Sequence, residues 1–195
     1  MRQFVNIAAN STLQHFSARV NYLDLLTSLA TTAEEWFRIE LLGVLRAIPA
    51  IKITATNQQP QNAVDRPDFT LNLFAHELLL ELKVLPKDRN YPYGWQRFQA
   101  GKNNKKDFQH LVSGVRQGVI YVYWPDLADW QGCRAKIETA YPVECVRQDQ
   151  IACAAGHTIL SYWGPVRDDV QPGAAEEASQ AGAPLSHSKV SLFQK

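Results

Sequence analysis

The chain has 195 residues, with 20 Lys and Arg against 19 Asp and Glu and a formal net charge of +1. This length suits one globular domain. Because the net charge is close to zero, the overall charge of the protein would not attract an anionic polymer, and any such affinity must come from a local basic patch. Three cysteines, without C-x-x-C spacing or paired histidines, argue against a zinc site and a disulfide framework and favour a cytoplasmic location. Because no apolar run reaches the length of an export signal or a membrane span, we expect a soluble protein.

The first third of the sequence predicts two helices and a strand. After a short extended opening, apolar residues recur at helical spacing from about residue 13 to 29. A second helix is predicted from about Thr32 to Ile48, and Thr32 followed by Glu35 fits a capping box at its start. The alternating, β-branched segment Ile51–Thr56 predicts a strand, and the polar residues 57–66 predict a loop.

The rest of the chain predicts a hairpin, a helix and further strands. We expect a hairpin from Pro67, a loop over 86–94 and a helix over 103–115, whose inward residues are Phe108, Leu111, Val112 and Val115. A strand over 119–124 and a helical turn over 126–130 follow. Two further strands are expected, one within 137–146 and the last over 157–163. The order helix, three strands, helix, strand predicts an α/β fold with a mixed central β-sheet flanked by helices. Residues 1–167 would form one domain with its core at about 32–124 and additional strands to about 164, and 168–195 a flexible tail.

The predicted hairpin carries three charged residues on one face. A turn centred on Ala75-His76 makes Asp68 face Lys83, with Glu81 one diagonal step away, and the alternation of side chains puts all three on the same side. A solvent-facing ion pair is the simplest interpretation. However, the second strand is apolar on both faces, as expected of a strand covered on both sides, where charges are costly unless paired or bound to metal. The pattern therefore favours a functional site.

Pro67-Asp68 followed by Glu81-Leu82-Lys83 resembles the P-D…(D/E)-x-K signature of the restriction-endonuclease-like, or PD-(D/E)xK, nuclease superfamily. The resemblance covers roughly residues 32–124 and includes the predicted element order, which is similar to the αβββαβ core of that superfamily. It implies a glutamate on the first core helix as a further catalytic residue. Glu40 occupies that place, while Glu34 and Glu35 on the same predicted helix remain alternatives.

The resemblance implies a hydrolase that depends on Mg²⁺ or Mn²⁺ and cleaves phosphodiester bonds. The carboxylates of Asp68 and Glu81 are the oxygen ligands that Mg²⁺ prefers, and the resemblance adds the backbone carbonyl of Leu82. The metal would lower the pKa of a bound water and neutralise charge on the scissile phosphate. Lys83 would position or help to deprotonate the nucleophile, and Glu40 would hold a second metal or orient a metal-bound water.

A basic segment with interspersed aromatic residues follows the hairpin, from Lys83 to Arg116. Such a segment is typical of contacts to a nucleic-acid backbone and of base stacking, although a solvated loop and helix face would have the same composition. The expected phosphate contacts are Lys102 and Lys105 first, then Lys106, Gln109 and Arg97. DNA is the expected partner. RNA is an alternative partner, because no feature of the sequence is specific for the 2′-hydroxyl. The sequence also leaves open whether the protein forms a homodimer.

Other catalytic templates do not fit the sequence. Gly94 and Gly101-Lys102-Asn103 lack the spacing and the Ser or Thr of a phosphate-binding loop, and the histidines are scattered. We therefore expect a metal-dependent nuclease that acts in defence, restriction or repair. The alternative is a non-catalytic nucleic-acid-binding or assembly protein that retains a nuclease-like fold.

Overall fold

The computed structural model describes residues 1–29, 33–56, 67–74, 76–85, 93–123, 127–154 and 156–166, without the side chains of 27–29, 102 and 103. The predicted loop at 57–66 and the predicted tail at 168–195 lie outside these residues. The elements are α1 (Arg2–Ser17), α2 (Val20–Leu29), α3 (Glu34–Arg46), β1 (Ile51–Thr56), β2 (Phe69–Leu73), β3 (His76–Leu85), α4 (Gly94–Ala100), α5 (Lys102–Val112), β4 (Gly118–Tyr123), α6 (Leu127–Ala140), β5 (Val143–Cys153) and β6 (Gly156–Pro165).

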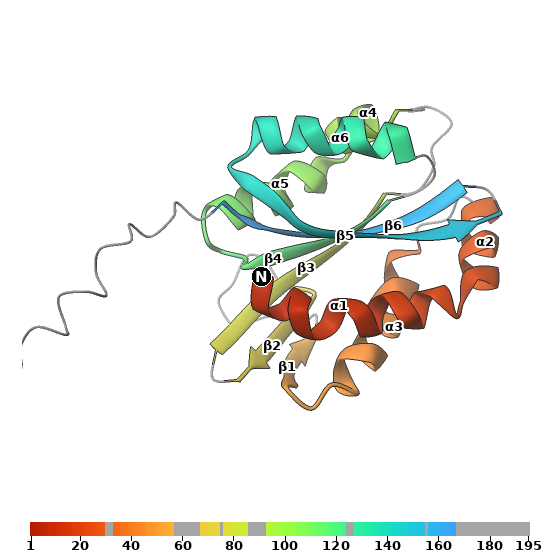
Figure 1. Cartoon of the computed structure of the whole chain (residues 1–195). Helices are drawn as coiled ribbons and strands as arrows, with labels where there is room; N and C mark the ends of the chain where they lie inside the picture. Colours follow the sequence, from red (N-terminus) through yellow and green to blue (C-terminus); the bar gives the residue numbers. More distant parts are fainter. Residues whose placement is uncertain are drawn as a thin grey trace, which may run out of the picture.

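The strands form one six-stranded mixed sheet in the order β1-β2-β3-β4-β6-β5. β3 and β4 run parallel, while every other neighbouring pair is antiparallel. Helices α1, α2 and α3 lie on one side of the sheet, and α4, α5 and α6 on the other (Figure 1). This arrangement confirms the predicted α/β class with a mixed central sheet flanked by helices.

The two helical layers cover two separate apolar cores, and β3 contributes to both. Leu80 and Leu82 are buried in the core beneath α1 and α3, whereas Leu85 belongs to the core beneath α5 and α6. Because side chains alternate along a strand, Glu81 and Lys83 share the α5 side with Leu85. The apolar character of β3 on both faces therefore reflects a strand covered on both sides, as the sequence indicated.

The N-terminal region is more helical than the sequence suggested. α1 begins at Arg2 rather than after an extended opening, and the predicted helix over 13–29 is divided where the chain turns at Ala18 and Arg19. The buried stripe of α1 includes the small residues Ala8 and Ala9, which carry a weak apolar signal. α3 begins at Glu34 with Ala33 as its N-cap, so the helix start lies later than predicted, and Thr32 is outside the described residues.

Several later elements also differ from the prediction. α5 ends at Val112, and Val112 and Val115 are 43% and 45% exposed rather than inward. Residues 127–130 of the predicted helical turn belong to the 14-residue helix α6, whose buried face contains Trp130, Cys133 and Ile137, and Asp126 lies outside the described residues. α4 was not predicted, because its short sequence has turn and aromatic residues instead of a helical apolar stripe.

The β2–β3 hairpin has a different register from the predicted one. Phe69 pairs with Leu80 and Leu73 with His76, so His76 begins β3 instead of occupying the centre of the turn. Phe74 makes the turn with a positive φ of 55°. By extension of this register Asp68 lies opposite Glu81, and the predicted pairing with Lys83 was wrong by two residues. Since the shift is an even number, the three charged side chains keep the same face.

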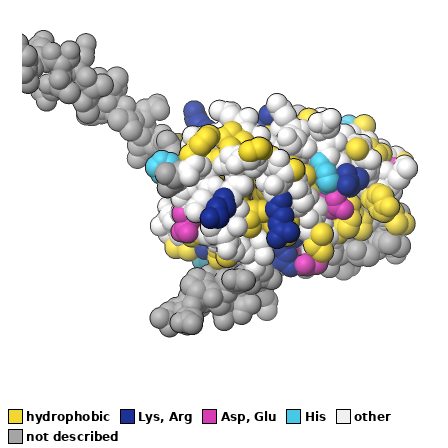
Figure 2. All heavy atoms as spheres, turned by 90° about the horizontal axis from the view of Figure 1, so that it is seen from below, with side chains coloured by type: hydrophobic (Ala, Val, Ile, Leu, Met, Phe, Trp, Pro, Cys, Tyr) yellow, Lys and Arg dark blue, Asp and Glu magenta, His cyan; other side chains and the backbone are white. Residues whose placement is uncertain are grey.

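Within the part of the chain that the structure describes, no helix is long and apolar enough to cross a membrane. Figure 2 looks onto the side that α1 and α3 cover, from below the view of Figure 1. Lys and Arg side chains on this face are separated by uncharged and apolar side chains, with acidic ones among them. This face therefore carries dispersed charges, whereas α5 lies on the other side of the sheet (Figure 1).

Candidate functional site

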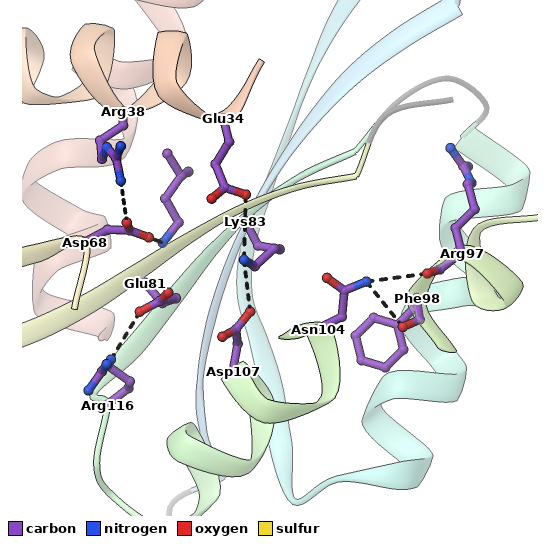
Figure 3. Close-up of polar contacts among 11 residues, drawn as sticks. Glu34, Arg38, Asp68, Glu81, Lys83, Arg97, Phe98, Asn104, Asp107 and Arg116 are labelled. Carbon is purple, nitrogen blue, oxygen red and sulfur yellow. Dashed lines mark hydrogen bonds and ion pairs between the residues drawn. The ribbon is translucent and has the colours of Figure 1, made fainter. Parts of the chain in front are cut away.

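Seven charged side chains from α3, β3, α5 and two loops meet around the middle of β3 (Figure 3). We call them the β3 charge cluster. Its members are joined by ion pairs and by electrostatic interaction, and they comprise Glu34, Arg38, Asp68, Glu81, Lys83, Asp107 and Arg116. Three of them, Asp68, Glu81 and Lys83, are residues that the sequence predicted to lie together.

Asp68 is fixed by two different partners. Its Oδ2 accepts a hydrogen bond from the backbone N–H of Leu82 at 2.8 Å, and its Oδ1 accepts one from Arg38 Nη1 at 3.0 Å. The residue is only 7% exposed. These contacts hold the carboxylate against the strand that carries Glu81 and Lys83, and a buried carboxylate needs such partners to offset its lost hydration.

Lys83 lies between two carboxylates from opposite layers (Figure 3). Its Nζ is 3.4 Å from Oδ2 of Asp107 on α5 and 3.6 Å from Oε2 of Glu34 at the start of α3. Burial alone would lower the pKa of Lys83, but Asp107, Glu34, Glu81 and Asp68 together outweigh it, and the pKa is raised. Lys83 is therefore a firmly protonated cation.

Glu81 is paired with Arg116, which precedes β4. Arg116 Nε donates to Glu81 Oε2 at 3.2 Å, and Arg116 is 3% exposed. Burial, together with the negative charges of Asp68 and Asp107, raises the pKa of Glu81 to about 8, against the lowering effect of Arg116. Burial also raises the pKa of Asp107 to about 6, although Lys83 opposes the shift. The cluster therefore accumulates negative charge that the arginines and Lys83 only partly compensate.

Glu40 does not join this cluster. Its Oε2 lies 2.5 Å from His15 Nε2 and 2.9 Å from Arg19 Nε, so it connects α3 to the N-terminal helical region. Residues that are two positions apart in a helix lie about 200° apart around its axis. Glu40 therefore points away from the side of α3 that carries Arg38. The residue of α3 that reaches Lys83 is Glu34, one of the alternatives, and we withdraw Glu40 from the predicted site. Glu35 pairs instead with Arg38.

The predicted phosphate-binding residues separate into two groups. Lys105, Lys106 and Gln109 are exposed on α5, and the side chain of Lys102 lies outside the described residues. Arg97, by contrast, is 4% exposed, donates to the Tyr123 hydroxyl at 2.5 Å and pairs with Asp129 at 3.4 Å. Arg97 therefore holds α4 against β4 and α6, and we withdraw it from the predicted phosphate contacts.

The described residues contain no group of three or more His, Cys, Asp or Glu side chains arranged to hold a metal ion. The donor set of the cluster nevertheless suits a hard divalent cation, because Asp68 and Glu81 offer carboxylate oxygens on one side of β3. Burial raises the pKa of Glu81 most, and the negative charges of Asp68 and Asp107 also raise it; a bound cation would relieve the repulsion among these carboxylates. Asp68 and Glu81 could therefore supply two carboxylate ligands to Mg²⁺ or Mn²⁺.

Sequence reasoning missed Arg38 and Asp107 and did not connect Arg116 to Glu81. One signal was available for Asp107, because it shares a helical face with Phe108 and Leu111, where a carboxylate is unusual. Arg38 lies four residues after Glu34, the spacing that puts two side chains on one helical face. The pairing of Arg116 with Glu81 depends on the parallel alignment of β3 and β4, which the sequence does not specify.

The chain was compared with protein-family models, with curated proteins and with solved structures, and none of the three comparisons gave a match.

Proposed function

We propose that the protein is a metal-dependent nuclease that hydrolyses phosphodiester bonds, with DNA as its substrate, in defence, restriction or repair. The observation that carries this proposal is the meeting of Asp68, Glu81 and Lys83 on one side of β3, each largely buried. Two carboxylates can hold a divalent cation, and an ammonium group can stabilise the charge that develops on the phosphate during hydrolysis.

The element order supports the same proposal. α3 is followed by β1, β2 and β3, then by α5 and β4, with α4 as an additional helix before α5. This is the order helix, three strands, helix, strand that the resemblance to the PD-(D/E)xK superfamily implies. Asp68 precedes the second of these strands, and Glu81 and Lys83 lie on the third, as in the signature.

In this proposal Asp68 and Glu81 hold Mg²⁺ or Mn²⁺, and the Leu82 carbonyl is a further candidate ligand. The bound ion would supply Lewis-acid chemistry, polarising the phosphate and lowering the pKa of a water. Lys83 contributes a fixed positive charge, because its raised pKa suits an ammonium that stabilises a phosphate oxygen better than a proton acceptor. Arg116 limits the charge on Glu81, and Arg38 fixes Asp68.

The exposed side of α5 is the proposed phosphate-binding surface. Lys105, Lys106 and Gln109 are exposed there, and Asp107 of the same helix reaches the cluster. One helix would therefore contact both the backbone of the nucleic acid and the residues around the scissile phosphate.

A second candidate function is a nucleic-acid-binding protein without catalysis. The observation that favours it is that three carboxylates already have a basic partner, since Asp68 pairs with Arg38, Glu81 with Arg116 and Asp107 with Lys83. Carboxylates that are paired in this way can have a purely structural role, and the exposed lysines of α5 would still contact phosphates.

Incubation of the pure protein with supercoiled plasmid, linear duplex, single-stranded DNA and RNA separates the two candidates. Each substrate is tested with Mg²⁺, with Mn²⁺ and with EDTA. We expect cleavage of DNA with either metal and none with EDTA. Binding of DNA without cleavage under every metal condition would favour the second candidate, and cleavage that is insensitive to EDTA would contradict the proposed metal dependence.

A further inference from the structure

Asp107 is a buried carboxylate that neither the signature nor the core explains. It is 5% exposed, and its Oδ2 lies 3.4 Å from Lys83 Nζ. No other side chain among the described residues makes a hydrogen bond to that oxygen. Its neighbour Phe108 and the residue one turn later, Leu111, are fully buried apolar side chains. An apolar residue would fill this position without the cost of burying a charge, so the carboxylate requires another reason.

The backbone around α5 is built to hold Asp107 in place. Asn104, three residues earlier and on the same side of the helix, donates through Nδ2 to the carbonyl oxygens of Arg97 and Phe98 at 3.4 and 3.2 Å (Figure 3). These carbonyls belong to the last turn of α4, where the Arg97 carbonyl also accepts a hydrogen bond from the backbone N–H of Gly101 at 3.1 Å. A Cβ at Gly101 would collide with the Asn104 amide, so glycine permits this close contact. α5 is thereby fixed against α4, with Asp107 directed at β3.

Lys83 is restrained from two sides, and Asp107 supplies the more buried restraint. The carboxylate of Asp107 is 7% exposed as a side chain and that of Glu34 is 37% exposed. Attraction between charges strengthens as water is excluded, so the contact with Asp107 is less screened. A lysine side chain otherwise carries considerable rotamer freedom. Asp107 therefore restricts where the ammonium group can lie.

We propose that Asp107 is a positioning residue that holds the Lys83 ammonium at the α5 side of β3, toward the carboxylates of Glu81 and Asp68. The inference rests on the nuclease function proposed above, in which Lys83 stabilises the phosphate. Asp107 itself touches neither the metal nor the substrate in this scheme. Its loss leaves substrate binding intact but lets the ammonium adopt other positions, so the catalytic step slows.

The test is a double-mutant cycle with Asp107→Asn and Lys83→Ala, read out as steady-state cleavage of DNA in Mn²⁺ over a range of substrate concentrations. Residues that orient a functional group contribute about 10- to 100-fold to activity when removed. We therefore expect Asp107→Asn to lower kcat by about 10- to 100-fold with KM unchanged, and Asp107→Glu to lose less. In the Lys83→Ala background, Asp107→Asn should have no further effect.

The matched control is Asp149→Asn, which removes a buried aspartate that pairs with Arg147 on β5, away from the cluster. It should keep wild-type kcat. Equal losses from Asp107→Asn with and without Lys83, or no loss at all, would overturn the positioning role and leave the nuclease proposal standing. A wild-type protein that cleaves no substrate with either metal would instead refute the nuclease function, and the role of Asp107 with it.

Discussion

Asp68 accepts a hydrogen bond from the backbone N–H of Leu82 at 2.8 Å, which ties the residue before β2 to the strand that carries Glu81 and Lys83. The same carboxylate accepts a second hydrogen bond from Arg38 of α3 at 3.0 Å. One buried side chain thus connects two strands and a helix. This contact explains why the conformation of the hairpin and the geometry of the charge cluster depend on each other.

The Asp68 contacts predict a loss of stability when the side chain is removed. Asp68→Ala leaves the Leu82 N–H without its acceptor and removes one of the two carboxylate partners of Arg38, and an unsatisfied buried donor costs about 1–3 kcal/mol. We expect the free energy of unfolding, measured by urea denaturation, to fall by that amount, and Asp68→Asn to lose less. An Asp68→Ala protein as stable as wild type would show that these contacts do not persist in solution.

The raised pKa of Glu81 predicts that the metal-free protein becomes less stable as pH rises. The folded-state pKa of about 8 exceeds the ordinary value of 4.5, so between these values the folded protein binds more protons than the unfolded chain. The free energy of unfolding therefore falls from pH 5 to pH 8, by at most about 1.4 kcal/mol per pH unit for this one proton. Asp107, with a pKa of about 6, adds to the fall below pH 6.

Urea denaturation in EDTA at several pH values checks this dependence. Glu81→Gln removes the titrating group and leaves the charge of Arg116 unchanged. We expect its stability to vary less between pH 6 and pH 8 than that of the wild type. Parallel curves for the two proteins over this range would mean that Glu81 titrates near its ordinary value.

Two glutamates of α3 should differ in their effects on cleavage. Glu34 contacts Lys83, whereas Glu40 contacts His15 and Arg19. Glu34→Gln should reduce the cleavage rate several-fold with little change in stability, because its contact with Lys83 is partly exposed. Glu40→Gln should lower the melting temperature and keep the cleavage rate of the protein that remains folded. The reverse pattern would return Glu40 to the site.

The lysines of α5 should determine the affinity for nucleic acid. Each lysine that contacts a phosphate contributes about one unit to the slope of log affinity against log salt concentration. We expect Lys105→Ala combined with Lys106→Ala to weaken binding and to reduce that slope by about two, measured by fluorescence anisotropy in EDTA. An unchanged slope would move the phosphate-binding surface away from α5.

Arg97 provides the contrast to those lysines. It is buried against Tyr123 and Asp129, and its loss removes a cation from the Asp129 carboxylate, which keeps its hydrogen bonds from the Gly94 N–H and the Tyr123 hydroxyl. Arg97→Ala should therefore lower stability by about 3–5 kcal/mol, the cost of breaking a buried pair. Binding by the folded protein should keep the wild-type salt dependence. A reduced salt slope with normal stability would restore Arg97 as a phosphate contact.

The sequence predicted the fold best where one strong local pattern determined an element. Ile51–Thr56 alternates and is β-branched, and β1 has those bounds. The common face of Asp68, Glu81 and Lys83 was predicted despite the wrong register, because alternation repeats every two residues and the error was two residues. The turn itself was misplaced since Phe74, which adopts a positive φ, is not a residue that ordinarily indicates a turn.

The ion-pair partners could not be predicted, because they depend on how the layers pack. Arg116 reaches Glu81 only through the parallel pairing of β3 with β4, and Asp107 reaches Lys83 only through the placement of α5. Arg97 was misinterpreted because charge in a sequence does not distinguish a solvated side chain from one buried against a tyrosine and an aspartate. Local patterns predicted the three signature residues, and tertiary packing supplied their partners.

The most direct test of the central claim compares DNA cleavage by the wild type and by Glu81→Gln in Mn²⁺, with both proteins shown to be folded by circular dichroism. Glutamine keeps the shape of the side chain and removes the anionic ligand. We predict metal-dependent cleavage by the wild type and a loss of at least about 100-fold in the variant. Equal cleavage rates would contradict the assignment of Glu81, and with it the proposed metal site on β3.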